Sequence, residues 1–132
     1  MLRRTRGTSG AEAIEFGIVI PVVLMFLLGI VDVGRLLWSN ATLAHAVEAA
    51  SRCAVVNTTI CGTTATIQAY AVTQAWSLGL APSAFTVNLT ATCGYQVSGT
   101  MNFKFTIPWY YVASPFGVSD SLTLNATACY PT

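Results

Sequence analysis

The sequence predicts an α+β protein in which a long N-terminal transmembrane helix carries a small external head. The head is expected to contain a second helix and a three-stranded antiparallel sheet. Three observations support this prediction: an apolar run near the N-terminus, three later segments in which apolar and polar residues alternate, and four cysteines that all follow the apolar run. Only 8% of the 132 residues are charged, against about 25% in ordinary soluble domains. The length allows one small domain and one membrane segment.

The first ten residues form a polar leader that precedes the apolar run. The leader contains Arg3, Arg4 and Arg6. The apolar run from Phe16 to Val31, extended backward by Ile14, has about 18 residues, or roughly 27 Å of helix, which is just enough to cross a bilayer. Basic residues before a span favour a cytoplasmic N-terminus, so the chain after about residue 36 is expected outside. Without the leader the chain is slightly acidic, which makes nucleic acid a poor candidate partner, and none is predicted.

The membrane helix is expected to continue outside the bilayer and to occupy residues 11–56, because no Gly or Pro occurs between Gly34 and Gly62. Pro21 lies inside the apolar run and removes a helical hydrogen bond, so a kink is expected there. Beyond the membrane, small and aliphatic residues recur at alternating spacings of four and three: Leu36, Asn40, Leu43, Val47, Ala50 and Ala54. This heptad-like stripe predicts packing on the chain's own head, on neighbouring helices near the membrane, or on both.

The head is predicted over residues 57–132. A helix is expected from Thr63 to Leu80, where Gly79 and Pro82 would end it. Its imperfect apolar face consists of Ile67, Tyr70, Ala71, Gln74, Trp76 and Leu78.

Three strands are predicted after this helix, because apolar residues there recur with a period of two. Gly94 and Tyr95 are the expected turn between the first two strands, and the segment from Pro108 to Ser121 is the expected loop before the third. The alternating segments are residues 85–93, 97–107 and 122–128.

Disulfide bonds are expected in the head, because small exported domains with an even number of cysteines are usually cross-linked. Sequence proximity favours Cys53 with Cys61, and Cys93 with Cys129, over the two other pairings. On the loop-entropy model these bonds contribute roughly 2.5 and 4 kcal/mol. The second pair conflicts with strand parity, since Cys129 has the opposite parity to Leu122; a bulge or a strand end would resolve the conflict.

Catalytic and metal-binding residues are scarce. His45 is the only histidine and the CxxC-type spacing of zinc sites is missing, so no metal and no cofactor are predicted. After Arg52 the only charged side chains are Lys104 and Asp120, so the usual catalytic sets cannot be assembled. The sequence predicts a protein that is not an enzyme and has no small-molecule substrate.

Two other interpretations of the N-terminal segment are possible. A cleavable secretory signal needs a small-x-small site close behind the apolar run, whereas the nearest such site, residues 44–46, lies beyond Asp32 and Arg35. In a eukaryotic secretory context the chain would be a glycosylated type II membrane protein, because it contains four Asn-x-Thr sequons. These begin at Asn40, Asn57, Asn88 and Asn125.

Glu15 stands where the membrane helix is expected to begin. An ionised carboxylate carried into the bilayer costs roughly 2.5 to 3.5 kcal/mol on insertion scales. A cut between Gly10 and Ala11 would create an α-amino group one helical turn from this carboxylate. The arrangement favours a prepilin over an ordinary signal anchor.

The N-terminal part of the chain resembles the TadE-like family, the pseudopilins of the bacterial tight-adherence pilus, which is related to type IV pili. The resemblance rests on residues 10–16 (Gly-Ala-Glu-Ala-Ile-Glu-Phe), on the Ile20-Pro21 step, on residues 29–35 (Gly-Ile-Val-Asp-Val-Gly-Arg) and on residues 46–52. Together these cover about forty contiguous residues. The rest of the chain is similar to the family only in its general plan.

The resemblance implies that a membrane prepilin peptidase cuts between Gly10 and Ala11, and that Glu15 takes the role of the family's glutamate at position five. The assembly residues would be Ala11, Glu15 and Phe16. A free α-amino group is largely cationic at neutral pH, so the Ala11 amine of one subunit can pair with Glu15 of its neighbour.

The implied protein is a minor pseudopilin of the bacterial inner membrane, with its head in the periplasm or beyond. Its partners would be the prepilin peptidase, other pilin and pseudopilin subunits, the inner-membrane assembly platform and membrane lipid. The alternative is a signal-anchored envelope protein that never polymerises and binds a ligand through a periplasmic domain.

Overall fold

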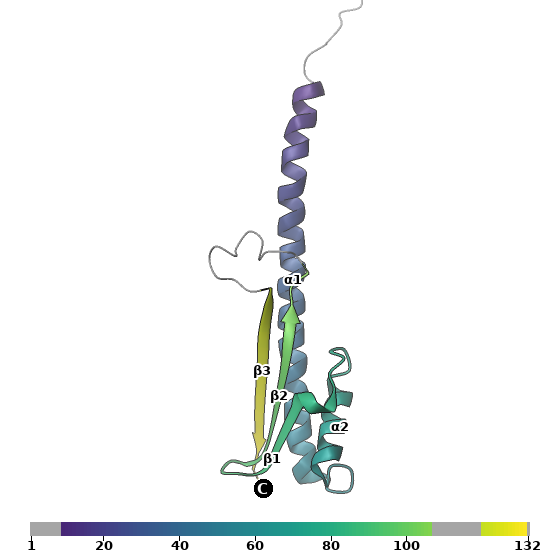
Figure 1. The fold of residues 1–132 in the computed structure, drawn as a ribbon, viewed down its shortest axis with the longest axis vertical. Coiled ribbons are helices and arrows are strands. Elements are labelled where there is room, and N and C mark those ends of the chain that lie inside the picture. The colour runs from purple at the N-terminus through teal and green to yellow at the C-terminus, as the bar shows by residue number, and fades with distance from the viewer. Residues whose placement is uncertain (1–8, 107–119, 132) are drawn as a thin grey trace, which may run out of the picture.

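A computed structural model describes residues 9–106 and 120–131 of the chain. One long helix extends far beyond a small head, which packs along the C-terminal half of that helix (Figure 1). The predicted α+β class is confirmed. The elements are α1 (Ser9–Val56), α2 (Thr64–Gln74), the short 3-10 helix η1 (Pro82–Ala84), β1 (Phe85–Ala91), β2 (Gly94–Lys104) and β3 (Ser121–Tyr130).

The helix α1 runs without a break from the apolar segment into the head, as the sequence predicted. Pro21 lies inside it, where the missing N–H removes one helical hydrogen bond. The kink expected at this position stays a prediction.

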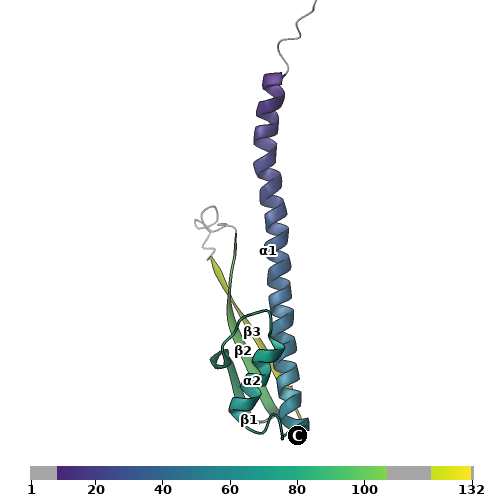
Figure 2. The same ribbon diagram turned by 90° about the vertical axis from the view of Figure 1, so that its right-hand side faces the viewer.

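The sheet is antiparallel with the strand order β1-β2-β3. The central strand β2 pairs with β3 over ten residues, from Tyr95 opposite Tyr130 to Lys104 opposite Ser121. The helix α1 packs on β2 and β3, and α2 packs on α1 and β1, so helices form one layer and the sheet the other (Figure 2).

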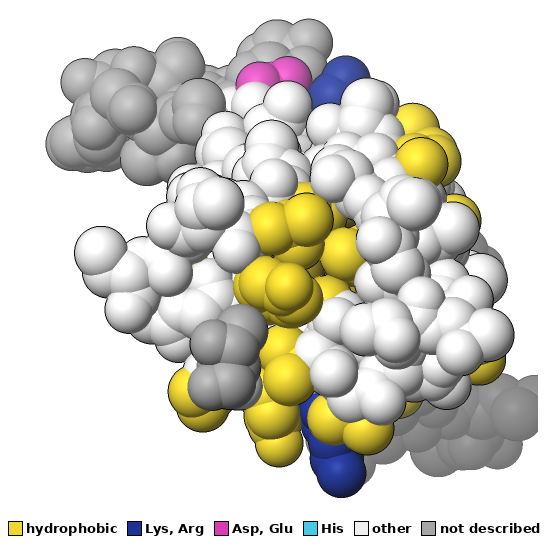
Figure 3. Space-filling model, turned by 90° about the horizontal axis from the view of Figure 1, so that it is seen from below, with side chains coloured by type: hydrophobic (Ala, Val, Ile, Leu, Met, Phe, Trp, Pro, Cys, Tyr) yellow, Lys and Arg dark blue, Asp and Glu magenta, His cyan; other side chains and the backbone are white. Residues whose placement is uncertain are grey.

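The core lies between these two layers. The large apolar side chains that are fully buried there include Leu43, Val47, Ile67, Phe85 and Val97. A Cβ at Gly99 would lie 2.9 Å from Leu43 Cδ1 and 3.0 Å from Phe85 Cε1, so the glycine lets β2 approach α1 closely. Figure 3 shows the end of the head opposite the N-terminus, where hydrophobic side chains fill a central strip among uncharged polar ones.

The C-terminal part of the stripe predicted on α1 packs against the head, as expected. Leu43, Val47, Ala50 and Ala54 are buried against the head, whereas Asn40 is exposed. Ser39, one residue before it, is buried.

The second helix is shorter than predicted. Its N-terminus agrees, since Thr63 caps the helix in a reciprocal capping box with Thr66. The helix ends at Gln74 rather than at Leu80, because the chain turns at Ala75, whose carbonyl accepts the N–H of Leu78. The turn leaves Trp76 exposed, although the sequence placed it on the apolar face.

The turn between β1 and β2 lies two residues earlier than predicted. Ala91 pairs with Gly94, so Thr92 and Cys93 form the turn, and Gly94 and Tyr95 open β2. Gly94 has φ of +113° and a Cβ there would lie 2.2 Å from the Tyr130 carbonyl oxygen, which only glycine tolerates. The predicted loop from Pro108 to Ser121 lies mostly outside the described residues; Ser121 itself begins β3.

Both expected disulfides are present. Cys53 is bonded to Cys61 and Cys93 to Cys129, with Cα atoms 5.8 and 6.1 Å apart. The parity conflict disappears because Cys93 lies in the turn, where strand alternation no longer fixes the side-chain direction. The first bond closes the link between α1 and α2, and the second joins the β1–β2 turn to the last strand.

Candidate functional site

The N-terminal half of α1 has no cover from the rest of the described chain. We call residues 10–31 the bare segment; every one is exposed except the half-buried Gly29. An 18-residue window of α1 is apolar enough to cross a membrane, and none of that window is buried. An apolar surface of this extent is uncommon on a water-soluble monomer and indicates contact with lipid or with other protein.

The residues predicted for processing and assembly lie together at the start of the bare segment. Gly10 and Ala11 are in the first turn of α1, which begins at Ser9, and Glu15 is one turn further along. Glu15 and Phe16 are both exposed. Within residues 9–106 and 120–131, no cation lies at ion-pair distance from Glu15. The carboxylate is therefore accessible to a cation supplied by another molecule.

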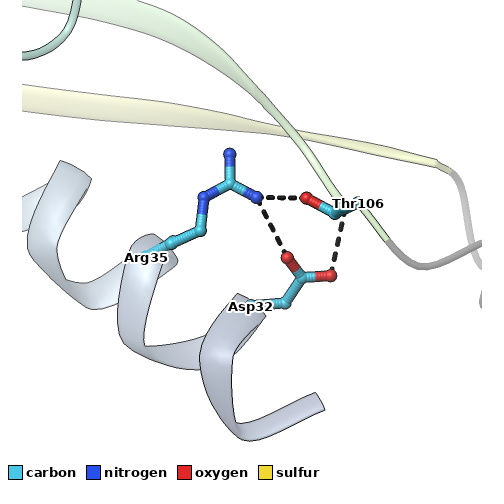
Figure 4. Close-up of polar contacts among 3 residues, drawn as sticks. All are labelled: Asp32, Arg35 and Thr106. Carbon is cyan, nitrogen blue, oxygen red and sulfur yellow. Dashed lines mark hydrogen bonds and ion pairs between the residues drawn. The ribbon is translucent and has the colours of Figure 1, made fainter. Parts of the chain in front are cut away.

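A cluster of polar side chains marks the point where the head begins. We call Asp32, Arg35, Phe103 and Thr106 the neck cluster. Asp32 is 2% exposed, and its two carboxylate oxygens accept from different donors (Figure 4). Arg35 Nη1 donates to Oδ1 at 3.0 Å, and the backbone N–H of Thr106 donates to Oδ2 at 3.0 Å. The carboxylate thus joins α1 to Thr106, which lies two residues after the end of β2.

Arg35 makes two further contacts within the neck cluster, one with Thr106 and one with Phe103. Its Nη1 also donates to the Thr106 hydroxyl, and its guanidinium carbon lies 5.4 Å from the centre of the Phe103 ring. Phe103 in turn meets Phe105 edge to face, with ring centres 5.3 Å apart. Hydrogen bonds to a buried carboxylate and a cation over an aromatic face each stabilise one geometry. The neck cluster fixes how the end of β2 sits against the membrane-length helix.

Sequence reasoning did not find the neck cluster. Thr106 is 74 residues from Asp32, and nothing local predicts that they meet. A signal was nevertheless present, since Asp32 and Arg35 are spaced i,i+3 directly after the apolar run, where charged residues are costly unless paired.

The chain's only histidine lies at a shallow hollow on the head. The residues that line this hollow include His45, Glu48, Arg52, Tyr70 and Gln74. Among the described residues, no group of three or more His, Cys, Asp or Glu side chains could hold a metal ion.

Fold and site together define a class of protein: in the described residues, one membrane-length helix continues into a small, disulfide-bonded α+β head. Within that class, the model of the TadE-like protein family matches residues 10–52. Residues 10–52 of this chain are therefore similar to the TadE-like family, as the sequence suggested. The match covers about a third of the chain and includes Glu15, Asp32 and Arg35. No curated protein and no solved structure matched the chain.

Proposed function

We propose that this protein is a minor pseudopilin of a tight-adherence pilus, cut after Gly10 by a prepilin peptidase. The observation that supports this most strongly is the position of Glu15, exposed on the bare segment and one helical turn from Ala11. Residues 1–10 are then the cytoplasmic leader, residues 11–56 the membrane and stem helix, and residues 57–132 the external head.

Assembly is driven by the bare segment. In lipid, an ionised Glu15 without a counter-ion is costly. The new amine of Ala11 in a neighbouring subunit is a cation at the same depth, so pairing neutralises both charges as the helices bundle. Phe16 and the apolar side chains that follow pack against neighbouring helices. Gly17 and Gly34 have open space around them, where another helix can approach closely.

The proposed location is the bacterial inner membrane, crossed once. The arginines of the leader favour a cytoplasmic N-terminus, and the two disulfides support an oxidising location for the head, the periplasm or beyond. The partners are the prepilin peptidase, other pilin and pseudopilin subunits, the inner-membrane assembly platform and lipid. The protein acts through packing contacts with neighbouring subunits, and not as an enzyme.

Processing is tested by expressing the full chain with and without a prepilin peptidase and measuring intact mass and N-terminal sequence. With the peptidase, we expect a protein that starts at Ala11. A Gly10→Leu variant should keep its leader, because a large side chain then stands at the scissile bond. A chain that still starts at Met1 in the presence of an active peptidase would contradict the proposal.

Assembly is tested by comparing Glu15→Gln with Glu12→Gln, which removes the same charge three residues away. Both variants should be cut after Gly10. Only Glu15→Gln should be lost from sheared pili, because it alone removes the partner of the neighbour's amine. A signal-anchored protein that never polymerises would be indifferent to both changes, and equal incorporation of the two variants would rule out the role given to Glu15.

A further inference from the structure

Two exposed tryptophans lie at the end of the head that faces the bare segment. Trp38 on α1 is 62% exposed and Trp76, in the turn after α2, is 77% exposed. Tryptophan buries a large area when it finds a partner, so two such side chains left uncovered by the head require an explanation.

The two tryptophans lie at a similar height along α1, although they are 38 positions apart in the sequence. A shallow hollow is lined by residues of α1 and by residues of the turn after α2. They are Val31, Gly34, Arg35, Trp38, Ser39, Ser77 and Leu78. Trp76 directly precedes Ser77, and consecutive Cα atoms are about 3.8 Å apart. The turn after α2 therefore brings Trp76 to the level of residues 31–39 of α1.

This level corresponds to the lipid headgroups if the bare segment spans the bilayer. Residues 10–31 give about 33 Å of helix, against a hydrocarbon core of about 30 Å. The Cα of Trp38 lies about 10 Å beyond that of Val31. Side chains on a helix tilt toward its N-terminus, which moves the indole of Trp38 back toward the membrane by several ångströms.

The chemistry of the surrounding surface suits an interface with lipid. Indole rings are enriched at headgroup depth, because one part of the ring is apolar and the N–H stays hydrated. The charged group beside the patch, Arg35, is already paired with Asp32, and from residue 53 onward the chain has only two charged side chains, Lys104 and Asp120, so few ions would be desolvated when the head contacts lipid. The patch is also continuous with the bare segment along α1.

We propose that Trp38 and Trp76 form an interfacial patch that seats the head on the outer leaflet of the membrane. The occupant is lipid at the boundary of headgroups and acyl chains. The patch fixes the depth and orientation of the head before the subunit is extracted into a fibre. This inference rests on the membrane placement of α1 in the proposed function.

The test uses the full-length chain reconstituted into phosphatidylethanolamine and phosphatidylglycerol vesicles. The lipids are brominated either near the headgroup end or near the tip of the acyl chain. Trp109, which lies outside the described residues, is replaced by Phe in every variant. One variant then keeps only Trp76 and another only Trp38. The matched control lacks all native tryptophans and carries Val56→Trp, an exposed position on the same helix about 27 Å beyond Trp38.

We expect shallow bromines to lower the fluorescence of Trp38 and of Trp76 more than deep bromines do, because indole rings collect at headgroup depth. The Val56→Trp control should be unaffected. If the protein floats with the vesicles but Trp76 behaves like the control, the interfacial patch is wrong while the membrane placement stands. If the protein does not float with vesicles, the membrane placement in the proposed function fails as well.

Discussion

The two halves of α1 differ in what surrounds them, although one unbroken helix contains both. Leu27 in the bare segment is 54% exposed, whereas Leu43 in the half covered by the head is fully buried. From Phe16 to Val31 the bare segment is apolar on all sides. The covered half has a stripe of buried residues on one side, and its exposed residues include the charged Arg35, Glu48 and Arg52 as well as apolar ones such as Trp38. All-round apolarity therefore marks the part of a helix that needs lipid or other subunits, and a stripe marks the part that its own head completes.

The boundary between the two halves is chemical as well as geometric. Asp32 is the first buried residue of α1 after the bare segment, and its carboxylate binds both Arg35 and the backbone of Thr106. The neck cluster thus ends the apolar segment and begins the head at the same residue. Four changes test this division, in order of decreasing effect.

Removal of the Cys93–Cys129 bond should have the largest effect. The bond spans 36 residues, so Cys93→Ser with Cys129→Ser should lower the free energy of unfolding of the head by about 4 kcal/mol. Losing the Cys53–Cys61 bond, which spans 8 residues, should lower it by about 2.5 kcal/mol. Urea titrations in mild detergent measure both. The bare segment should stay helical by circular dichroism, and loss of that helicity together with the head would contradict the division.

Truncation of a buried leucine should have the next largest effect. Leu43→Ala leaves a cavity against Phe85 and Gly99, and should destabilise the head by about 3 kcal/mol. Leu27→Ala is the matched control on the same helix, and should change head stability by less than about 0.5 kcal/mol. Equal losses in urea titrations of the two variants would show that the bare segment contributes to the fold of the head.

Neutralising the carboxylate of the neck cluster should have a smaller effect. Asp32→Asn weakens the hydrogen bond from Arg35 and should cost about 1 to 3 kcal/mol of head stability. Glu48→Gln, which removes an exposed charge from the same helix, is the control. Hydrogen exchange at the Thr106 amide gives a local measure and should become faster only in the Asp32 variant. An unchanged exchange rate would mean that Asp32 does not stabilise the backbone at Thr106.

The smallest effect on the head is expected at Glu15. Glu15→Gln lies in the bare segment, 17 residues before Asp32, and should leave the urea midpoint of the head within about 0.5 kcal/mol of the original. This result would separate the assembly defect proposed for the same variant from misfolding. A clear loss of head stability would instead link the two halves of α1.

Local patterns predicted the elements well but several boundaries less well. The membrane-length run, the absence of Gly and Pro over residues 35–61 and the two-residue alternation were sufficient for α1 and the three strands. The end of α2 and the β1–β2 turn were misplaced. Leu78 reaches the core only after a turn at Ala75, and Cys93 is held in a turn by its bond to Cys129. Both depend on contacts that are distant in the sequence.

The sequence by itself determined which parts the molecule has: one membrane-length helix, a head with two disulfides, and a TadE-like N-terminus with Glu15 one helical turn beyond Gly10 and Ala11. Those features depend on spacing along a single helix or on local periodicity. Only the tertiary structure decided that Asp32 meets Thr106, that Asn40 faces outward, and that Trp38 and Trp76 lie at one level. Each of these depends on how the sheet and α2 pack on α1. That packing is set by the shape of the whole core, to which residues far apart in the chain contribute.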